Sequence, residues 1–232
     1  MRRILTLGLA AGVLGGATLA SGGAAQEPGP SCADQPATIV GKGLIRGTDG
    51  PDVIVGSAKS DVIFARGGDD FVCAGQGHDV VFGGSGNDGM AGDDGSFGGP
   101  AEPGGNDLMF GESGDDQMFG ESGSDAIEAG AGNDFAAGQG AKDAVHGGDG
   151  DDQLFGGPRE DIVSGGKGND FMQGNLANDL LLGGPGDDEM DGDNQVTPMP
   201  PPLPDPPGNA DVCLGDGGTD TAVNCERTRG VP

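Results

Sequence analysis

The chain has 232 residues, of which 52 are Gly and 16 are Pro; it has no Trp or Tyr, and its formal net charge is −27. With so few large apolar side chains it cannot build the core that an ordinary domain of this length buries, and low hydrophobicity with high charge is by itself typical of disordered chains. So acidic a chain is a poor ligand for nucleic acid and anionic lipid, and it attracts cations.

The N-terminus has the features of an export signal. Arg2 and Arg3 precede an apolar run that extends to Ala20, and small residues follow it. We predict a secretory signal peptide over residues 1–25, cleaved after Ala20 or Ala25. The alternative is a membrane anchor, which is less well supported because the run is short and rich in glycine and no basic flank follows it. We therefore expect a secreted, extracellular protein with no membrane span in the mature chain.

The four cysteines indicate two disulfides in an exported chain. Three connectivities are possible. Positions along the chain favour the pairs Cys32–Cys73 and Cys213–Cys225, one near each end of the mature sequence. Residues 26–46 are expected to be a polar leader followed by one strand, within ATIVGKGLI, that caps the segment after it.

A nine-residue period begins at Gly47 and extends through residues 47–223, with loop insertions at 96–105 and 195–208. The sixth position is Asp in all seventeen repeats, the eighth is apolar or Cys, and the first and fourth are mostly Gly. Residues 224–232 are expected to form a C-terminal tail. No random sequence would keep one residue type at so regular a spacing, so the repeats define the architecture.

The repeats GGSGNDGMA, GGDGDDQLF, GGKGNDFMQ and GGPGDDEMD follow the pattern G-G-x-G-x-D-x-U-x. This pattern resembles the RTX, or haemolysin-type, calcium-binding nonapeptide family. The resemblance implies an all-β fold, a right-handed parallel β-roll (β-solenoid) of about eight coils with calcium-binding turns on its edges. It also implies six turn residues and three strand residues per repeat, two repeats per coil, and an ion between the turns of repeats n and n+2.

The residue types support the same interpretation. Glycine allows the positive φ angles of tight turns, and carboxylate and carbonyl oxygens are the ligands that Ca²⁺ prefers. In a three-residue strand the eighth position points to one face, so it fills a thin core. Such a core is too small to fold the chain alone, and multiple Ca²⁺ ions bound only in the folded state would contribute the rest.

Successive turns alternate between two edges, and we expect the edges to differ. Every odd-numbered repeat has Gly at the fourth position, whereas only three of eight even-numbered repeats do, with Gly95 assigned to the turn that holds the first insertion. Lys59, Lys142 and Arg159 could replace calcium as partners of Asp61, Asp143 and Asp161. Up to eight sites are predicted on the odd edge and two on the even edge, flanked by Asp79, Asp107 and Asp125. The candidate ligands of the odd edge are Asp52, Asp70, Asp88, Asp116, Asp134, Asp152, Asp170, Asp188 and Asp220. Those of the even edge are Asp61, Asp79, Asp107, Asp125, Asp143, Asp161, Asp179 and Asp211.

Outward positions of alternate repeats predict two apolar ladders on one sheet face. A contiguous apolar patch suggests a contact site, unless the leader or an insertion covers it. The residues are Val62, Phe64, Val80, Phe82, Leu108 and Phe110.

No catalytic motif is present, and His78 and His146 are expected on the surface of different coils. RTX enzymes carry their chemistry in a separate domain, so we expect no enzyme. The leading hypothesis is a secreted calcium-binding protein that folds on binding calcium, as a cell-surface or extracellular structural module. The alternative is a calcium-dependent, adhesin-like protein that recognises a cell-surface or matrix partner through its apolar face. A lytic or hydrolytic activity is disfavoured.

Overall fold

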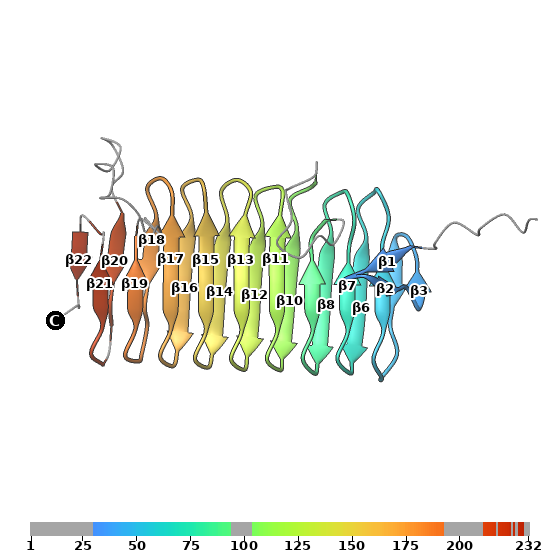
Figure 1. Cartoon of the computed structure of the whole chain (residues 1–232), viewed down its shortest axis with the longest axis horizontal. Coiled ribbons are helices and arrows are strands. Elements are labelled where there is room, and N and C mark those ends of the chain that lie inside the picture. The colour runs from blue at the N-terminus through green and yellow to red at the C-terminus, as the bar shows by residue number, and fades with distance from the viewer. Residues whose placement is uncertain are drawn as a thin grey trace, which may run out of the picture.

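Short strands alternate between two parallel sheets in the computed structural model, which describes residues 30–93, 104–192, 211–216, 218–223, 225 and the backbone of 227–229. Each strand pairs with the strand two further along the chain, so every coil contributes one strand to each ten-stranded sheet (Figure 1). The fold is all-β, a parallel β-solenoid, as predicted. None of the described residues forms a helix that is long and apolar enough to cross a membrane.

The first sheet holds the odd-numbered strands. They are β3 (Ile39–Val40), β5 (Val53–Val55), β7 (Phe71–Cys73), β9 (Gly89–Ala91), β11 (Gln117–Glu121), β13 (Phe135–Gln139), β15 (Gln153–Gly157), β17 (Phe171–Asn175), β19 (Glu189–Asp191) and β21 (Thr221–Val223).

The second sheet holds the even-numbered strands. They are β4 (Leu44–Arg46), β6 (Val62–Gly67), β8 (Val80–Ser85), β10 (Leu108–Ser113), β12 (Ala126–Ala131), β14 (Ala144–Asp149), β16 (Ile162–Lys167), β18 (Leu180–Leu182), β20 (Val212–Leu214) and β22 (Arg227–Arg229).

The repeat register continues across both insertions. Leu108 pairs with Val80 on one side and with Ala126 on the other, although more residues separate it from Val80. Leu180 likewise pairs with Val212. The strands on either side of each insertion therefore keep the repeat register, and the described eighth positions still point inward. Residues 94–103 and 193–210, which contain most of the two expected insertions, lie outside the described residues, as does the expected signal peptide.

The core consists of eighth-position side chains from both sheets. Ile54, Ile63, Leu154, Met172 and Leu181 are all fully buried. Because each strand contributes one inward eighth-position side chain, joined on β6 and β12 by the small Ala65 and Ala129, the apolar interior is thin, as the sequence predicts. The turns must therefore contribute much of the ordering free energy.

Many strands in the middle of the solenoid are longer than the three residues expected for each repeat, whereas several toward its ends, such as β5 and β19, keep three. Strands of the second sheet reach six residues because the first three positions of the following repeat continue the pairing, as in Glu128↔His146 followed by Gly130↔Gly148. A glycine with positive φ at the second position, such as Gly148 at 123°, bends the strand end into the turn.

Both ends of the solenoid depart from the expected simple caps. The segment expected as one capping strand forms two, β3 and β4, because the chain turns at Gly43, whose φ is 74°. The leader adds the hairpin of β1 (Ser31–Cys32) and β2 (Gln35–Pro36), and the tail adds β22 beside β20. The disulfides are Cys32–Cys73 and Cys213–Cys225, so the favoured connectivity is confirmed.

Candidate metal centres at the turns

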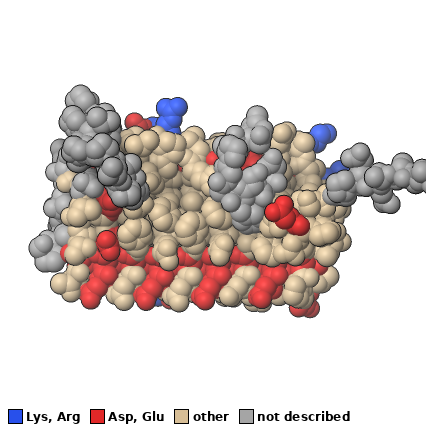
Figure 2. Space-filling model, in the orientation of Figure 1, with Lys and Arg blue, Asp and Glu red and all other residues tan. Residues whose placement is uncertain are grey.

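The turns lie along two opposite edges of the solenoid. We call "odd edge" the row of turns that lead from the second sheet to the first, from residues 47–52 to 215–220, and "even edge" the row that leads back. Acidic side chains form a continuous band along the odd edge, the lower rim in Figure 2, whereas the insertions interrupt the even edge. The repeated aspartates are therefore brought together as two rows.

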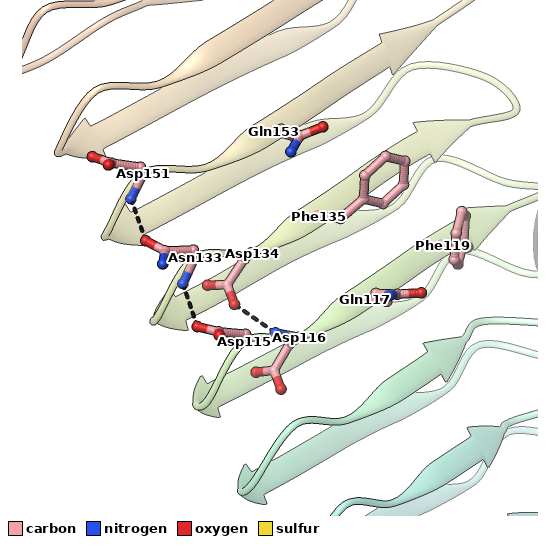
Figure 3. A pocket seen from close by; sticks show the side chains of 9 residues that line it. All are labelled: Asp115, Asp116, Gln117, Phe119, Asn133, Asp134, Phe135, Asp151 and Gln153. Atoms are coloured by element: carbon pink, nitrogen blue, oxygen red, sulfur yellow. Dashed lines mark hydrogen bonds between the residues drawn. The ribbon is translucent and has the colours of Figure 1, made fainter.

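Each sixth-position aspartate is buried and bonded to the next one on its edge. The backbone N–H of Asp116 donates to Oδ1 of Asp134 at 2.8 Å (Figure 3), and that of Asp134 donates to Oδ1 of Asp152, also at 2.8 Å. The even edge repeats the arrangement, for example from Asp143 to Asp161 at 2.7 Å. In each turn, one carboxylate oxygen thus bonds the backbone of the preceding turn on the same edge.

The second oxygen of most of these carboxylates, Oδ2, is buried and accepts no hydrogen bond. A buried polar atom without a partner costs free energy, and a charged one costs more. A cation at that atom would remove the cost. The side chains concerned are Asp70, Asp79, Asp88, Asp107, Asp116, Asp125, Asp134, Asp143, Asp152, Asp161, Asp170, Asp188 and Asp220.

Burial changes the acidity of these groups. It raises the pKa of Asp152 to about 7, that of Asp107 to about 8 and that of Asp125 to about 9. Burial is the largest cause, the backbone N–H bond opposes it, and the charges of neighbouring carboxylates add to it. Without a cation, the folded chain therefore favours protonated aspartates.

Carbonyl oxygens converge on the same places. A Cβ added at Gly147 would lie 2.2 Å from Oδ2 of Asp152 and 2.6 Å from the carbonyl oxygen of Gly165. One coil further, a Cβ at Gly165 would meet Oδ2 of Asp170 at 2.2 Å and the carbonyl oxygen of Gly183 at 2.7 Å. Only glycine fits there, and the oxygens that converge are hard ligands suited to Ca²⁺.

To form a metal site, the carboxylates would need those carbonyl oxygens as additional ligands. Within the described ranges, no three His, Cys, Asp or Glu side chains come together as a metal-binding group. Any ion would therefore be held by carboxylates of adjacent turns, with backbone oxygens completing the shell. The donor set fits calcium, which takes six to eight oxygen ligands, some of them carbonyls.

The first two turns are closed in a different way. Oδ2 of Asp52 accepts the N–H of Thr48 at 2.7 Å and its hydroxyl at 2.9 Å, and Oδ2 of Asp61 accepts the N–H of Ser57 at 2.7 Å. Both oxygens of these two aspartates therefore have partners within the protein. The signal in the sequence is a hydroxyl residue at the second position of the repeat.

The backbones of the two edges differ. At the fourth position of odd turns, Gly132 has φ 143° and donates its N–H to the carbonyl of Asp149 in the next coil at 2.9 Å. On the even edge, Ala141 donates back to Gly123 at 3.1 Å, and Ala177 has φ 95° despite its Cβ. Gly105 stacks on the fourth-position Gly77 of the preceding coil, whose carbonyl oxygen a Cβ at Gly105 would meet. The nine-residue count assigns this fourth position to Gly95.

Among the described residues, no ion pair joins the basic side chains to the aspartates that they were expected to partner. The ammonium of Lys142 pairs with Glu160, not with Asp143, and both partners are largely exposed. Its charge lowers the pKa of Asp161, but less than burial and the charge of Asp143 raise it. No ion pair joins Lys59 or Arg159 to a described carboxylate. Fourth- and fifth-position side chains point out of the turn, whereas the sixth-position carboxylate points beneath it.

A second ladder, which the sequence analysis missed, runs along the outside of the odd edge at the fifth position. The N–H of Asn133 donates to Oδ1 of Asp115 at 2.8 Å, and that of Asp151 donates to Oδ1 of Asn133 at 2.9 Å (Figure 3). Asp and Asn alternate along the ladder, which separates like charges that would otherwise stack one coil apart. A hollow of about 380 Å³ lies beside it, and its lining includes Phe119 and Phe135, which lie away from the ladder (Figure 3). The ladder consists of Asp69, Asn87, Asp115, Asn133, Asp151, Asn169 and Asp187.

A parallel β-solenoid with rows of buried carboxylates and converging carbonyls on its edges belongs to the class of calcium-binding repeat proteins. The profile of the RTX calcium-binding nonapeptide repeat (4 copies) matches residues 46–81, 74–96, 104–136, 119–154, 128–163 and 155–190. The chain belongs to this family. No curated protein matches it.

Proposed function

We propose that the protein is exported and that its repeats fold on binding several Ca²⁺ ions, forming an extracellular or cell-surface structural module. The observation that carries the proposal is the row of buried Oδ2 atoms without hydrogen-bond partners, several of which lie next to a glycine where a carbonyl oxygen converges, as those of Asp88, Asp152 and Asp170 do. Each ion would cancel two negative charges of a chain whose net charge is −27. Two disulfides are consistent with an oxidising compartment.

Isothermal titration with calcium, paired with elemental analysis of the dialysed protein, tests the number of ions. We expect several ions per chain, held mainly by the odd edge, with affinities of roughly 10⁻⁴–10⁻³ M, as in extracellular modules. Asp134→Ala and Asp170→Ala should each lower the count. Binding of no ion, or of a single ion, would overturn the proposal.

We propose no catalytic role. Nδ1 of His78 accepts the N–H of Asn106 at 2.7 Å at an exposed turn, whereas His146 lies on the outer face of the second sheet, 3.6 Å from Glu128. The two imidazoles belong to different coils and share no described partner.

A second candidate function is recognition of a surface partner. The rings of Phe64, Phe82 and Phe110 stack on the outer face of the second sheet, with centroids 4.8 and 4.9 Å apart, as the sequence predicts. Pull-down of cell-surface material with and without calcium separates the two functions. Calcium-dependent capture that Phe82→Asp abolishes would favour recognition over a purely structural role.

A further inference from the structure

The outer face of the second sheet carries an unbroken aliphatic row, beside which the ninth positions include polar residues such as Glu128, His146 and Ser164. The seventh position is aliphatic on every strand from β4 to β20, and strand pairing sets these residues side by side. Leu44, Leu108 and Ile162 are 55%, 38% and 49% exposed. The row consists of Leu44, Val62, Val80, Leu108, Ala126, Ala144, Ile162, Leu180 and Val212.

The other sheet does not share this character. At its N-terminal end the hairpin of β1 and β2 covers the outer face, where Cys32 packs against Val53 and Cys73. Further along, its outward seventh positions include Gln117, Gln153 and Glu189, which are exposed. The rings of Phe119, Phe135, Phe155 and Phe171 also pack along the outer face of this sheet. Its seventh positions nevertheless alternate between aromatic and polar residues on these strands, whereas those of the second sheet are aliphatic on every strand from β4 to β20.

A shallow hollow of about 300 Å³ interrupts the apolar face near its middle, where the small side chains Ala126 and Ala144 replace larger ones. Glu128 and His146 stand beside it, with Oε1 and Nε2 3.6 Å apart. On the central strands β12 and β14, the outward seventh position is thus a small Ala and the outward ninth position is a large polar residue.

We propose that this face is the contact surface between two copies of the chain, packed sheet against sheet. The sheet is about 45 Å long, since strands lie about 4.8 Å apart, and a contact about 15 Å wide would bury roughly 1,400 Å² over both copies. That area lies within the range of standard specific interfaces. The proposal rests on the proposed function in that calcium first orders the sheet.

The charge distribution favours one orientation. With a two-fold axis along the solenoid, the strands of the two copies run in opposite directions and the acidic odd edges lie on opposite sides, where they repel least. Each strand then faces its counterpart, so the row of Phe82 lies over the row of Val80 in the second copy. The hollow at Ala126 and Ala144 receives Glu128 and His146 of the second copy.

Sedimentation equilibrium of the full chain at about 10 μM, a concentration at which standard interfaces are largely formed, tests the proposal. Phe82→Asp and Ile162→Asp place a charge in the two halves of the face. Phe155→Asp is the matched control on the first sheet. We expect a calcium-dependent dimer for the wild type and the control. Both face variants should be folded monomers, with dimer dissociation constants raised at least about 100-fold.

A calcium-loaded wild type that is folded and monomeric would overturn the proposal. That result would hold even if another segment of the same chain covered the face. Dimers of unchanged stability in both face variants would also overturn it. A chain whose circular dichroism does not respond to calcium contradicts the proposed function instead. Sedimentation with and without calcium would still decide the dimer in that case.

Discussion

The backbone N–H of Asp134 donates a hydrogen bond at 2.8 Å to Oδ1 of Asp152, one coil further along, while Oδ2 of Asp152 is buried with no hydrogen-bond partner. One side chain therefore both closes the preceding turn and leaves an oxygen for a ligand from outside the protein. This division explains why the repeat keeps Asp and not Ala or Leu at its sixth position.

Asp152→Asn should change stability in opposite directions with and without calcium. The amide can still accept the N–H of Asp134 but carries no charge, so the metal-free chain loses a buried carboxylate whose pKa is about 7. With calcium the variant lacks an anionic ligand, and we expect its unfolding free energy to fall by about 1–3 kcal/mol. Urea unfolding in calcium and in chelator checks both signs; the same sign in both conditions would contradict the assignment.

Asp134→Ala should impair calcium-driven folding more than Asp161→Ala. Both variants remove the acceptor of a backbone N–H, from Asp116 and Asp143 respectively, so that cost is matched. They differ in turn geometry, since Gly132 has φ 143° whereas Arg159 does not adopt a positive φ. We expect the calcium midpoint of folding to rise at least about tenfold for Asp134→Ala, or about 1.4 kcal/mol, and less for Asp161→Ala. Equal shifts would refute the difference between the edges.

Gly150→Ala should destabilise the solenoid, while Gly50→Ala should not. Gly150 has φ 145°, and an added Cβ would lie 1.7 Å from the carbonyl oxygen of Gly132. An L-residue in that conformation costs roughly 1–2 kcal/mol before the clash is counted, so we expect a loss of at least about 2 kcal/mol. No atom lies within 4 Å of a Cβ at Gly50, which has no positive φ. Thermal unfolding in calcium measures both, and a tolerated Gly150→Ala would argue against the packed turn.

The metal-free chain should gain structure on acidification. Burial raises the folded-state pKa values of sixth-position aspartates from 3.8 to about 6 for Asp116, about 7 for Asp88 and about 9 for Asp125. The folded state thus binds more protons than the unfolded state, so its stability falls as pH rises from about 4 through those values. Circular dichroism in chelator at pH 4 and pH 8 checks the sign; greater order at pH 8 would contradict it.

The fold was predicted from the resemblance of the repeats to a known family, and the repeat spacing supports it. A spacing of nine residues with apolar eighth positions determines which side chains point inward, and Ile63, Leu154 and Met172 are fully buried as expected. The disulfide pairing followed from position along the chain. These features depend on periodicity and chain topology, which a sequence displays directly.

The details of the turns were less accessible because they depend on where surface side chains point. Lys142 precedes Asp143 in the sequence, yet its flexible stem carries the ammonium to Glu160 in the next coil. The N–H and the hydroxyl of Thr48 both donate to Asp52, a role that only the folded turn reveals. The buried Asp93, outside the repeat pattern, accepts N–H bonds from Gly105 at 3.3 Å and Ser122 at 3.0 Å.

The central claim is that calcium ions at the buried aspartates fold the repeats. Far-UV circular dichroism of the full chain at pH 7.5, titrated from chelator into calcium with magnesium as the control ion, tests it most directly. We expect a largely unordered spectrum in chelator and a cooperative gain of β-structure with calcium but not with magnesium at equal concentration. A β-rich spectrum and an unchanged melting temperature in chelator would contradict it.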